Sequence, residues 1–126
     1  MTELETNRIK GFLGLCYRAG QVILGQDACV DAVRRETAAL VLLDVGSTET
    51  SKKRFRNACR SHGVPLHGMP EGLIAGALGK SGAMAVALRQ GTMAEKLKEL
   101  IPDEAALDIQ QFNYPNDRAD IAGVQA

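Results

Sequence analysis

The sequence RAGQVILG at residues 18–25 encloses a short apolar run, residues 22–24, between two glycines. Glycine is favoured where a helix or strand ends and the chain turns. This segment therefore predicts that a helix stops at Gly20, that residues 21–24 form a strand and that the strand stops at Gly25. Apolar residues recur at helical spacing on both sides of it: Ile9, Phe12, Leu13 and Cys16 before, and Cys29, Ala32 and Val33 after.

The same alternation continues along the chain. Residues 40–43, Leu-Val-Leu-Leu, form a continuous apolar run, which is typical of a strand buried on both faces. Strands are expected at 21–24, 40–43, 64–68 and 83–88, and helices at about 6–19, 26–36, 50–62, 71–78 and 92–101. This order predicts an α/β domain in which layers of helices cover a sheet.

Side-chain oxygens mark several helix starts. Residues 46–48, Gly-Ser-Thr, offer caps for the helix at 50–62. Thr92-Met93-Ala94-Glu95 matches the capping-box pattern. At the helix that follows Gly25, Asp27 is a candidate cap.

Charge divides the chain into two parts. The 126 residues carry 15 basic and 15 acidic side chains, which excludes a polycation that binds nucleic acid by bulk charge alone. Residues 1–102 hold 14 of the basic and 10 of the acidic side chains, whereas residues 103–126 hold 1 and 5. We expect one mildly basic domain at 1–102 and an acidic, mostly disordered tail at 103–126.

The cysteines and the apolar runs indicate a cytoplasmic protein. Three cysteines without a CxxC pair suggest neither a disulfide framework nor a zinc ribbon. The first residues are acidic rather than basic, so no signal peptide is expected. The longest apolar runs, 38–43 and 83–88, are too short to span a bilayer.

The helix at 50–62 carries the sharpest charge feature, five cations within nine residues: Lys52, Lys53, Arg54, Arg56 and Arg60. The spacing places Lys52, Arg56 and Arg60 on one exposed face. The opposite face, expected to join the core, carries Phe55, Ala58, Cys59 and His62. Such a stripe fits contacts to nucleic-acid phosphates, and it equally fits a merely solvated helix face.

Motifs for catalysis are weak. Gly79-Lys80-Ser81 is similar to the end of a phosphate-binding loop, but Ile74 occupies the position of the required glycine, and the segment precedes a strand instead of following one. Asp44, at the end of a buried strand, is the best catalytic candidate, yet no residue pairs with it in the sequence. His62 and His67 have no catalytic or metal-binding spacing. We expect neither enzymatic activity nor a cofactor nor a metal.

The succession of these segments resembles the kink-turn RNA-binding ribosomal protein superfamily, that of L-seven-Ae and L-thirty-e, and most closely its small bacterial YlxQ-like members. The resemblance covers about residues 7–101. It rests on 18–25, on 39–43 and on several shorter pieces: Leu13-Gly14-Leu15, Thr50-Ser51-Lys52-Lys53, Val64-Pro65 and Ala77-Leu78-Gly79-Lys80.

The resemblance implies a three-layer α/β/α sandwich with a mostly four-stranded mixed sheet. It also implies binding to structured RNA, often a kink-turn in ribosomal or regulatory RNA. The family's first contact turn, Gly-x-Asn-Glu followed by a lysine, corresponds to residues in which only the glycine is kept: Gly25, Gln26, Asp27, Ala28 and Asp31. The second contact loop corresponds to Lys80, Ser81 and Gly82. With the basic helix, the expected RNA-contacting set is completed by Arg18, Gln21, Lys52, Lys53 and Arg56.

The function expected from these features is a non-enzymatic, ribosome-associated RNA-binding protein, monomeric and without a membrane partner. Two other interpretations stay open. The same fold serves as a protein–protein adaptor that has lost or weakened RNA binding. It also occurs as the recognition domain ahead of some RNA ribose methyltransferases, although 126 residues leave no room for the catalytic domain.

Overall fold

Strand β2 (Ala38–Asp44) lies in the middle of a four-stranded sheet and is buried on both faces. The structure, a computed structural model, describes residues 1–102. The strands run in the order β1–β4–β2–β3, with β1 at Val22–Leu24, β3 at Leu66–Met69 and β4 at Ala85–Arg89. Strand β2 pairs in parallel with β3 and antiparallel with β4, which also pairs antiparallel with β1. The expected mixed four-stranded sheet is confirmed.

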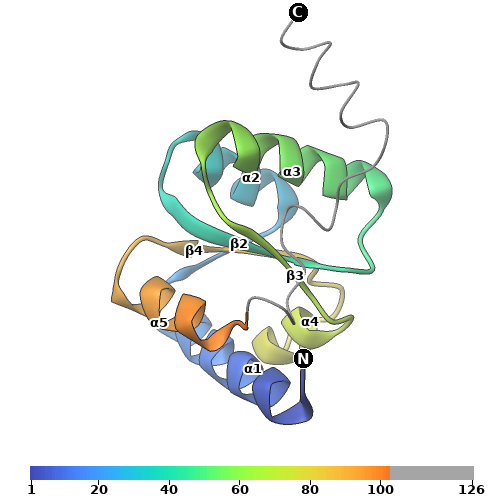
Figure 1. Cartoon of the computed structure of the whole chain (residues 1–126), viewed down its shortest axis with the longest axis vertical. Helices are drawn as coiled ribbons and strands as arrows, with labels where there is room; N and C mark the ends of the chain where they lie inside the picture. The colour runs from blue at the N-terminus through green and yellow to red at the C-terminus, as the bar shows by residue number, and fades with distance from the viewer. Residues whose placement is uncertain (103–126) are drawn as a thin grey trace, which may run out of the picture.

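Two layers of helices cover the sheet (Figure 1). One face is covered by α1, α4 and α5, and the other by α2 and α3. The helices are α1 (Glu3–Arg18), α2 (Gln26–Arg34), α3 (Glu49–His62), α4 (Leu73–Leu78) and α5 (Thr92–Leu100). The α/β/α sandwich and the strict alternation of helices and strands agree with the expectation from the sequence.

The protein has two hydrophobic cores, one on each face of the sheet, and alternate residues of β2 point into each of them. Leu40 and Leu42 point into the core beneath α1, α4 and α5, whereas Val41 and Leu43 point into the core beneath α2 and α3. All four side chains are fully buried. Truncating such a leucine to alanine costs about 2–5 kcal/mol, a large part of a typical domain stability of about 5–15 kcal/mol. Both helix layers are therefore needed.

Helices α1 and α4 pack closely at one glycine. A Cβ added to Gly14 would lie 2.9 Å from the backbone oxygen of Ala77 in α4. That distance is shorter than van der Waals contact, and the atom met is backbone that side-chain rotation cannot move. Gly14 therefore permits the approach of the two helices.

The capping-box prediction at Thr92–Glu95 is wrong. Helix α5 begins after Gly91 without a side-chain cap, and the capping box is at the start of α1 instead. There the Glu5 backbone N–H donates to Thr2 Oγ1 at 3.1 Å, and the Thr2 backbone N–H donates to Glu5 Oε1 at 2.8 Å. The bond from the Thr2 backbone lowers the pKa of Glu5. Helix α1 consequently starts earlier than its apolar periodicity predicts.

Two further expectations are resolved on α3. Thr48 Oγ1 accepts from the Ser51 backbone N–H at 3.1 Å, so the predicted cap of this helix is confirmed. His62 is exposed rather than part of the core, with its Nδ1 4.0 Å from Glu36 Oε2. His62 instead lines a surface depression together with Glu36 and Ala38, at the start of β2. The tail expected at 103–126 lies outside the described residues.

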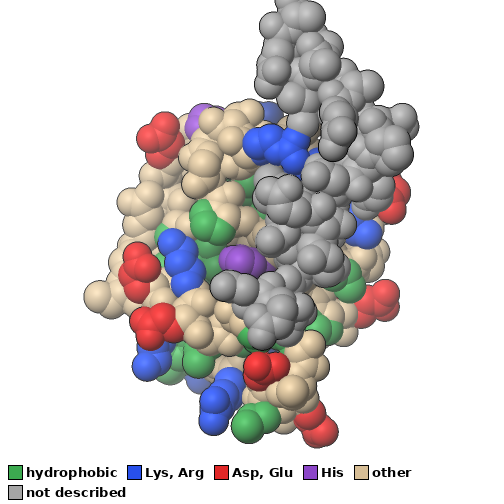
Figure 2. All heavy atoms as spheres, viewed as in Figure 1, with side chains coloured by type: hydrophobic (Ala, Val, Ile, Leu, Met, Phe, Trp, Pro, Cys, Tyr) green, Lys and Arg blue, Asp and Glu red, His purple; other side chains and the backbone are tan. Residues whose placement is uncertain are grey.

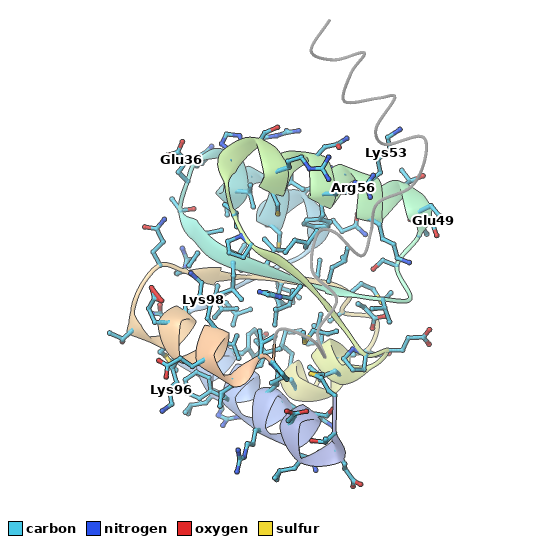
Figure 3. All side chains as sticks on the ribbon, viewed as in Figure 1. Glu36, Glu49, Lys53, Arg56, Lys96 and Lys98 are labelled. Carbon is cyan, nitrogen blue, oxygen red and sulfur yellow. The ribbon has the colours of Figure 1, made fainter. Side chains whose placement is uncertain are left out.

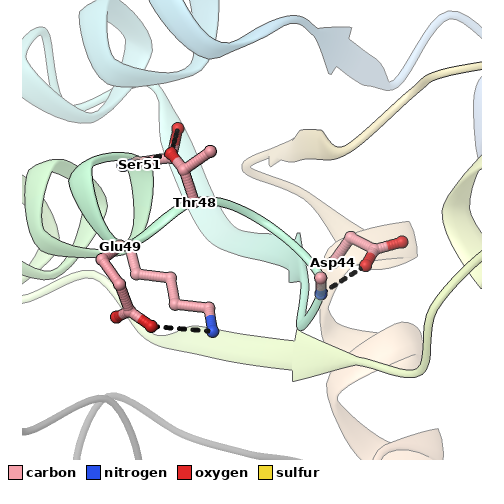
Figure 4. A network of polar contacts seen from close by, with 6 residues as sticks. Asp44, Thr48, Glu49 and Ser51 are labelled. Carbon is pink, nitrogen blue, oxygen red and sulfur yellow. Dashed lines mark hydrogen bonds and ion pairs between the residues drawn. The ribbon is translucent and has the colours of Figure 1, made fainter.

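The side chain of Asp44 joins two loops at the carboxyl end of β2. Its side chain is 3% exposed. Oδ1 accepts from the backbone N–H of Gly46 at 2.6 Å (Figure 4). Oδ2 accepts from the backbone N–H of Gly72 at 2.9 Å. Both oxygens of the best catalytic candidate therefore hold backbone: they fix the turn into α3 and the start of α4.

Replacing Asp44 with alanine removes the acceptor of both N–H groups, and we expect a loss of about 1–3 kcal/mol in the free energy of unfolding. Urea denaturation followed by circular dichroism measures it. Asp31→Ala is the control, because Asp31 forms only an exposed ion pair with Arg35 and should cost less than about 1 kcal/mol. Equal stabilities of the two variants would contradict the structural role of Asp44.

The thiols of the folded protein should react slowly. All three cysteines, Cys16, Cys29 and Cys59, are free and buried. Burial raises the pKa of Cys16, and raises that of Cys29 and Cys59 to about 12, so little reactive thiolate exists at neutral pH. Labelling with a disulfide reagent at pH 8 should be slow for the native protein and fast in denaturant. Rapid labelling of the native protein would contradict this packing.

Candidate functional site

The end of β1 and the loop before β4 meet beside the first turn of α2. The backbone N–H of Gly25 donates to the carbonyl oxygen of Ala85 at 3.2 Å, which holds the two segments together. A depression of about 300 Å³ lies at this junction. It is lined by Leu24, Gly25 and Gln26 from one segment and by Lys80, Ser81, Gly82, Ala83, Met84 and Ala85 from the other. Two contact segments that are far apart in the sequence are thus adjacent in space.

The first turn of α2 has no side-chain cap. Gly25 is the N-cap residue, with φ of 104°, a conformation that favours glycine. The position of Asp27 suggested that it caps this helix, but it does not. Its Oδ1 instead lies 2.8 Å from Arg54 Nη1 of α3. Within residues 1–102, no side chain caps the backbone N–H groups that open α2, and Gly25 and Gln26 line the same depression as Lys80.

Helix α3 also contacts the residue before Asp27. The Ser51 hydroxyl donates to Gln26 Oε1 at 3.0 Å. Ala28 and Asp31, further along α2, are exposed, and Asp31 Oδ2 lies 3.0 Å from Arg35 Nε. Asp27 and Asp31 thus each have a cationic partner.

Arg18 reaches toward this region and Gln21 does not. A Cβ on Gly14 would lie 3.5 Å from Arg18 Nη1 and 2.9 Å from the Ala77 oxygen, so the guanidinium lies back along α1 near the end of α4. Helix α4 leads directly into the loop of Lys80. The Gln21 carbonyl instead accepts from the Arg89 backbone N–H, at the other end of the β1–β4 pair.

The three expected cations of α3 have different surroundings. Arg56 is fully buried, so its expected place on an exposed face is wrong. Helical spacing alone could not reveal this, because it shows which side chains share a face and not what covers that face. The Lys52 side chain is 15% exposed, and its Nζ lies 3.9 Å from Glu49 Oε1 (Figure 4). Lys53 lies on the outer side of α3 (Figure 3).

Other surfaces are less suited to a ligand whose charges all have the same sign. A depression of about 480 Å³ lies at the opposite end of the sheet, and it is lined by side chains of both signs, including Glu36, Glu95 and Lys98. On the face shown in Figure 2, basic and acidic side chains are interspersed. Among residues 1–102, no group of histidine, cysteine and carboxylate side chains is arranged to hold a metal ion, and no helix is long and apolar enough to cross a membrane.

Arg54 is absent from the set of RNA-contacting residues expected from the sequence. Its position in the run of cations was visible, but nothing in the spacing showed that it faces α2. The sequence shows that Arg54 and Asp27 carry opposite charges, but only the packing of α2 against α3 brings the two side chains together.

Comparison with known proteins bears on this arrangement. No protein-family model matches the chain. The RNA-binding protein YlxQ of Bacillus subtilis is 30% identical over 90 residues, which cover 71% of this chain and 90% of that protein. The RNA-binding protein YlxQ of Enterococcus faecium is 28% identical over 102 residues, 80% of this chain and 98% of that protein.

Solved structures show the same fold. A Bacillus halodurans protein of unknown function superposes with a TM-score of 0.69 at 26% identity, covering 73% of this chain and 94% of the other. The Giardia lamblia 15.5kD RNA binding protein superposes with a TM-score of 0.62 at 16% identity, covering 80% and 93%. With the sandwich fold and the identity to YlxQ over most of its length, the chain belongs to the YlxQ family of the L-seven-Ae superfamily.

Proposed function

We propose that this chain is a non-enzymatic protein that binds structured RNA at the corner formed by the first turn of α2 and the loop at residues 80–82. The observation that carries the proposal is the depression where Gly25 and Gln26 meet Lys80, Ser81 and Gly82. The names of the two YlxQ relatives and of the Giardia protein as RNA-binding proteins support it.

The chemistry of the corner suits a sugar–phosphate backbone. Uncapped N–H groups at the start of a helix, together with its dipole, favour an anion. Lys80 is exposed at the rim and adds a full positive charge. Gly25 and Gly82 have no side chain to keep a backbone at a distance. RNA is recognised largely through shape and backbone contacts of this kind.

The acidic residues Asp27 and Asp31 oppose a phosphate less than their charges alone suggest. Each lies within 3.0 Å of an arginine nitrogen, Arg54 for Asp27 and Arg35 for Asp31. Each pair is close to neutral as a unit. We therefore keep kink-turn-like RNA, ribosomal or regulatory, as the proposed partner, and a monomer associated with the ribosome in the cytoplasm as the proposed setting.

The proposal is tested with a labelled kink-turn RNA, a base-changed control RNA and a plain duplex, each at low and physiological salt. We expect preference for the kink-turn RNA and a steep fall of affinity with salt. Lys80→Glu should weaken binding by about tenfold or more, because it reverses a charge beside phosphate. Lys96→Glu, an exposed site on α5, is the matched control and should bind within about twofold of the wild type.

The outcomes separate the open interpretations. Equal binding to all three RNAs, lost with salt, would remove kink-turn selectivity and leave backbone contact. No binding at low salt would contradict the proposal and favour the protein–protein adaptor. In that case a protein partner should remain bound after nuclease treatment at high salt.

Deleting residues 103–126 should tighten RNA binding. The segment has a net charge of −4 and the remaining chain has +4, so its removal takes away an intramolecular competitor for the basic domain. Binding to the same RNA at low salt measures the change. A variant of full length with Asp103, Glu104 and Asp108 replaced by Asn, Gln and Asn separates charge from length. Unchanged affinity in both would refute the competition.

A further inference from the structure

The corner between α2 and α3 contains two side-chain contacts that lie next to each other in the sequence of α2. Ser51 contacts Gln26 at 3.0 Å, and Arg54 contacts Asp27 at 2.8 Å. Gln26 lines the depression of the proposed site, and Asp27 follows it directly. Helix α3, on the sheet face opposite to α4, therefore contacts the two residues that open α2 beside that depression.

The first contact orients the Gln26 amide. Ser51 is 8% exposed, and its Oγ accepts from the Thr48 hydroxyl at 3.1 Å (Figure 4). With that acceptor position occupied, the Ser51 proton goes to Gln26 Oε1. The oxygen of the Gln26 amide is thus engaged by α3, and its NH₂ group is directed away from that contact. An amide presented in this way offers hydrogen-bond donors to a ligand in the depression.

The second contact leaves Arg54 able to bind a further anion. Nη1 of Arg54 lies 2.8 Å from Asp27 Oδ1, and the Arg54 side chain is 39% exposed. A guanidinium carries several N–H donors in a planar fork that matches the oxygens of a phosphate. The geometry around Asp27 therefore leaves donors of Arg54 facing solvent beside the first turn of α2.

The ion pair itself is easily exchanged. The Asp27 side chain is 93% exposed, and exposed ion pairs contribute little to stability. A phosphate that approaches the first turn of α2 meets Arg54 already extended toward it. Such a phosphate also replaces a weakly held carboxylate rather than a strongly bound one.

We propose that Arg54 is an RNA-contacting residue that binds a phosphate beside Gln26, and that Asp27 holds its guanidinium in place when RNA is absent. The inference rests on the proposed function and extends it from α2 and the 80–82 loop onto α3. Arg54 and Lys80 would then hold the RNA from the two sides of the α2 start, one from each face of the sheet.

The test compares Arg54→Gln with Arg35→Gln. Arg35 is a matched control, because it forms the same kind of exposed pair, with Asp31, at the other end of α2. The dissociation constant of the full-length protein for the preferred RNA is measured across a series of salt concentrations. We expect Arg54→Gln to weaken binding by about tenfold and to lower the slope of log K against log salt by about one. Arg35→Gln leaves Asp31 without its partner, so it should weaken binding by about twofold or less and leave the salt slope unchanged.

The salt slope separates a phosphate contact from a structural role, because a partly unfolded variant loses active protein without losing one counterion per complex. Circular dichroism of both variants checks the fold. If the wild type binds RNA and Arg54→Gln behaves like Arg35→Gln, this inference is overturned and the proposed function stands. If the wild type binds none of the RNAs, the proposed function fails first.

Asp27→Ala tests the second half of the proposal. Removing the carboxylate frees Arg54 and takes a negative charge away from the RNA, so binding at low salt should become tighter, with a salt slope no smaller than that of the wild type. Weaker binding would mean that the carboxylate itself contacts the RNA, and it would overturn the holding role of Asp27.

Discussion

The burial of β2 on both faces is the constraint on which the other elements depend. Leu40 and Leu42 require a helix layer on one side, and Val41 and Leu43 require one on the other. No short loop satisfies this requirement, because it would leave its own polar backbone buried without partners. The chain therefore crosses from one face of the sheet to the other repeatedly. These crossings create the loops at the ends of the strands, where the candidate site lies.

One hydrogen-bonded pair positions that site. Strand β1 has only three residues, and its antiparallel pairing with β4 ends where Gly25 meets Ala85. The short strand releases the chain into α2 directly beside the loop that precedes β4. A longer β1 would carry the first turn of α2 past that loop. The length of β1 thus brings Gln26 and Lys80 into one depression.

Along α2 and the first half of α3, several cations lie beside carboxylates. Asp27 lies against Arg54, Asp31 against Arg35, and Lys52 near Glu49. Paired charges reduce non-specific attraction, because each pair is nearly neutral at a distance. They still provide guanidinium and ammonium groups to a ligand that approaches closely enough to replace the carboxylates. Such a surface suits a partner recognised by shape more than one attracted by net charge.

The sequence by itself determined the order of helices and strands, the buried character of β2 and the positions where Gly20 and Gly25 end their elements. These features follow from hydrophobic periodicity and backbone preference, which depend on residues close together in the sequence. The first helix was expected to begin at about residue 6 and begins at Glu3, and the capping box was expected at Thr92–Glu95 and lies at Thr2–Glu5. Two similar capping patterns occur in the sequence, and only geometry shows which one forms its bonds. Asp44 was the best catalytic candidate by its position at the end of a strand, whereas in the structure both of its oxygens accept from the backbone of Gly46 and Gly72.

Only the tertiary structure decided which charged residues belong to the candidate site. The run of cations on α3 was visible in the sequence, but its spacing suggested Arg56 as an exposed contact, and that side chain is buried. Arg54 became relevant because α3 packs against α2 and places it 2.8 Å from Asp27, a residue 27 positions earlier. Helical periodicity reports directions around one axis, whereas a binding surface depends on which helices lie side by side. That pairing is settled by the packing of both helices on the shared sheet.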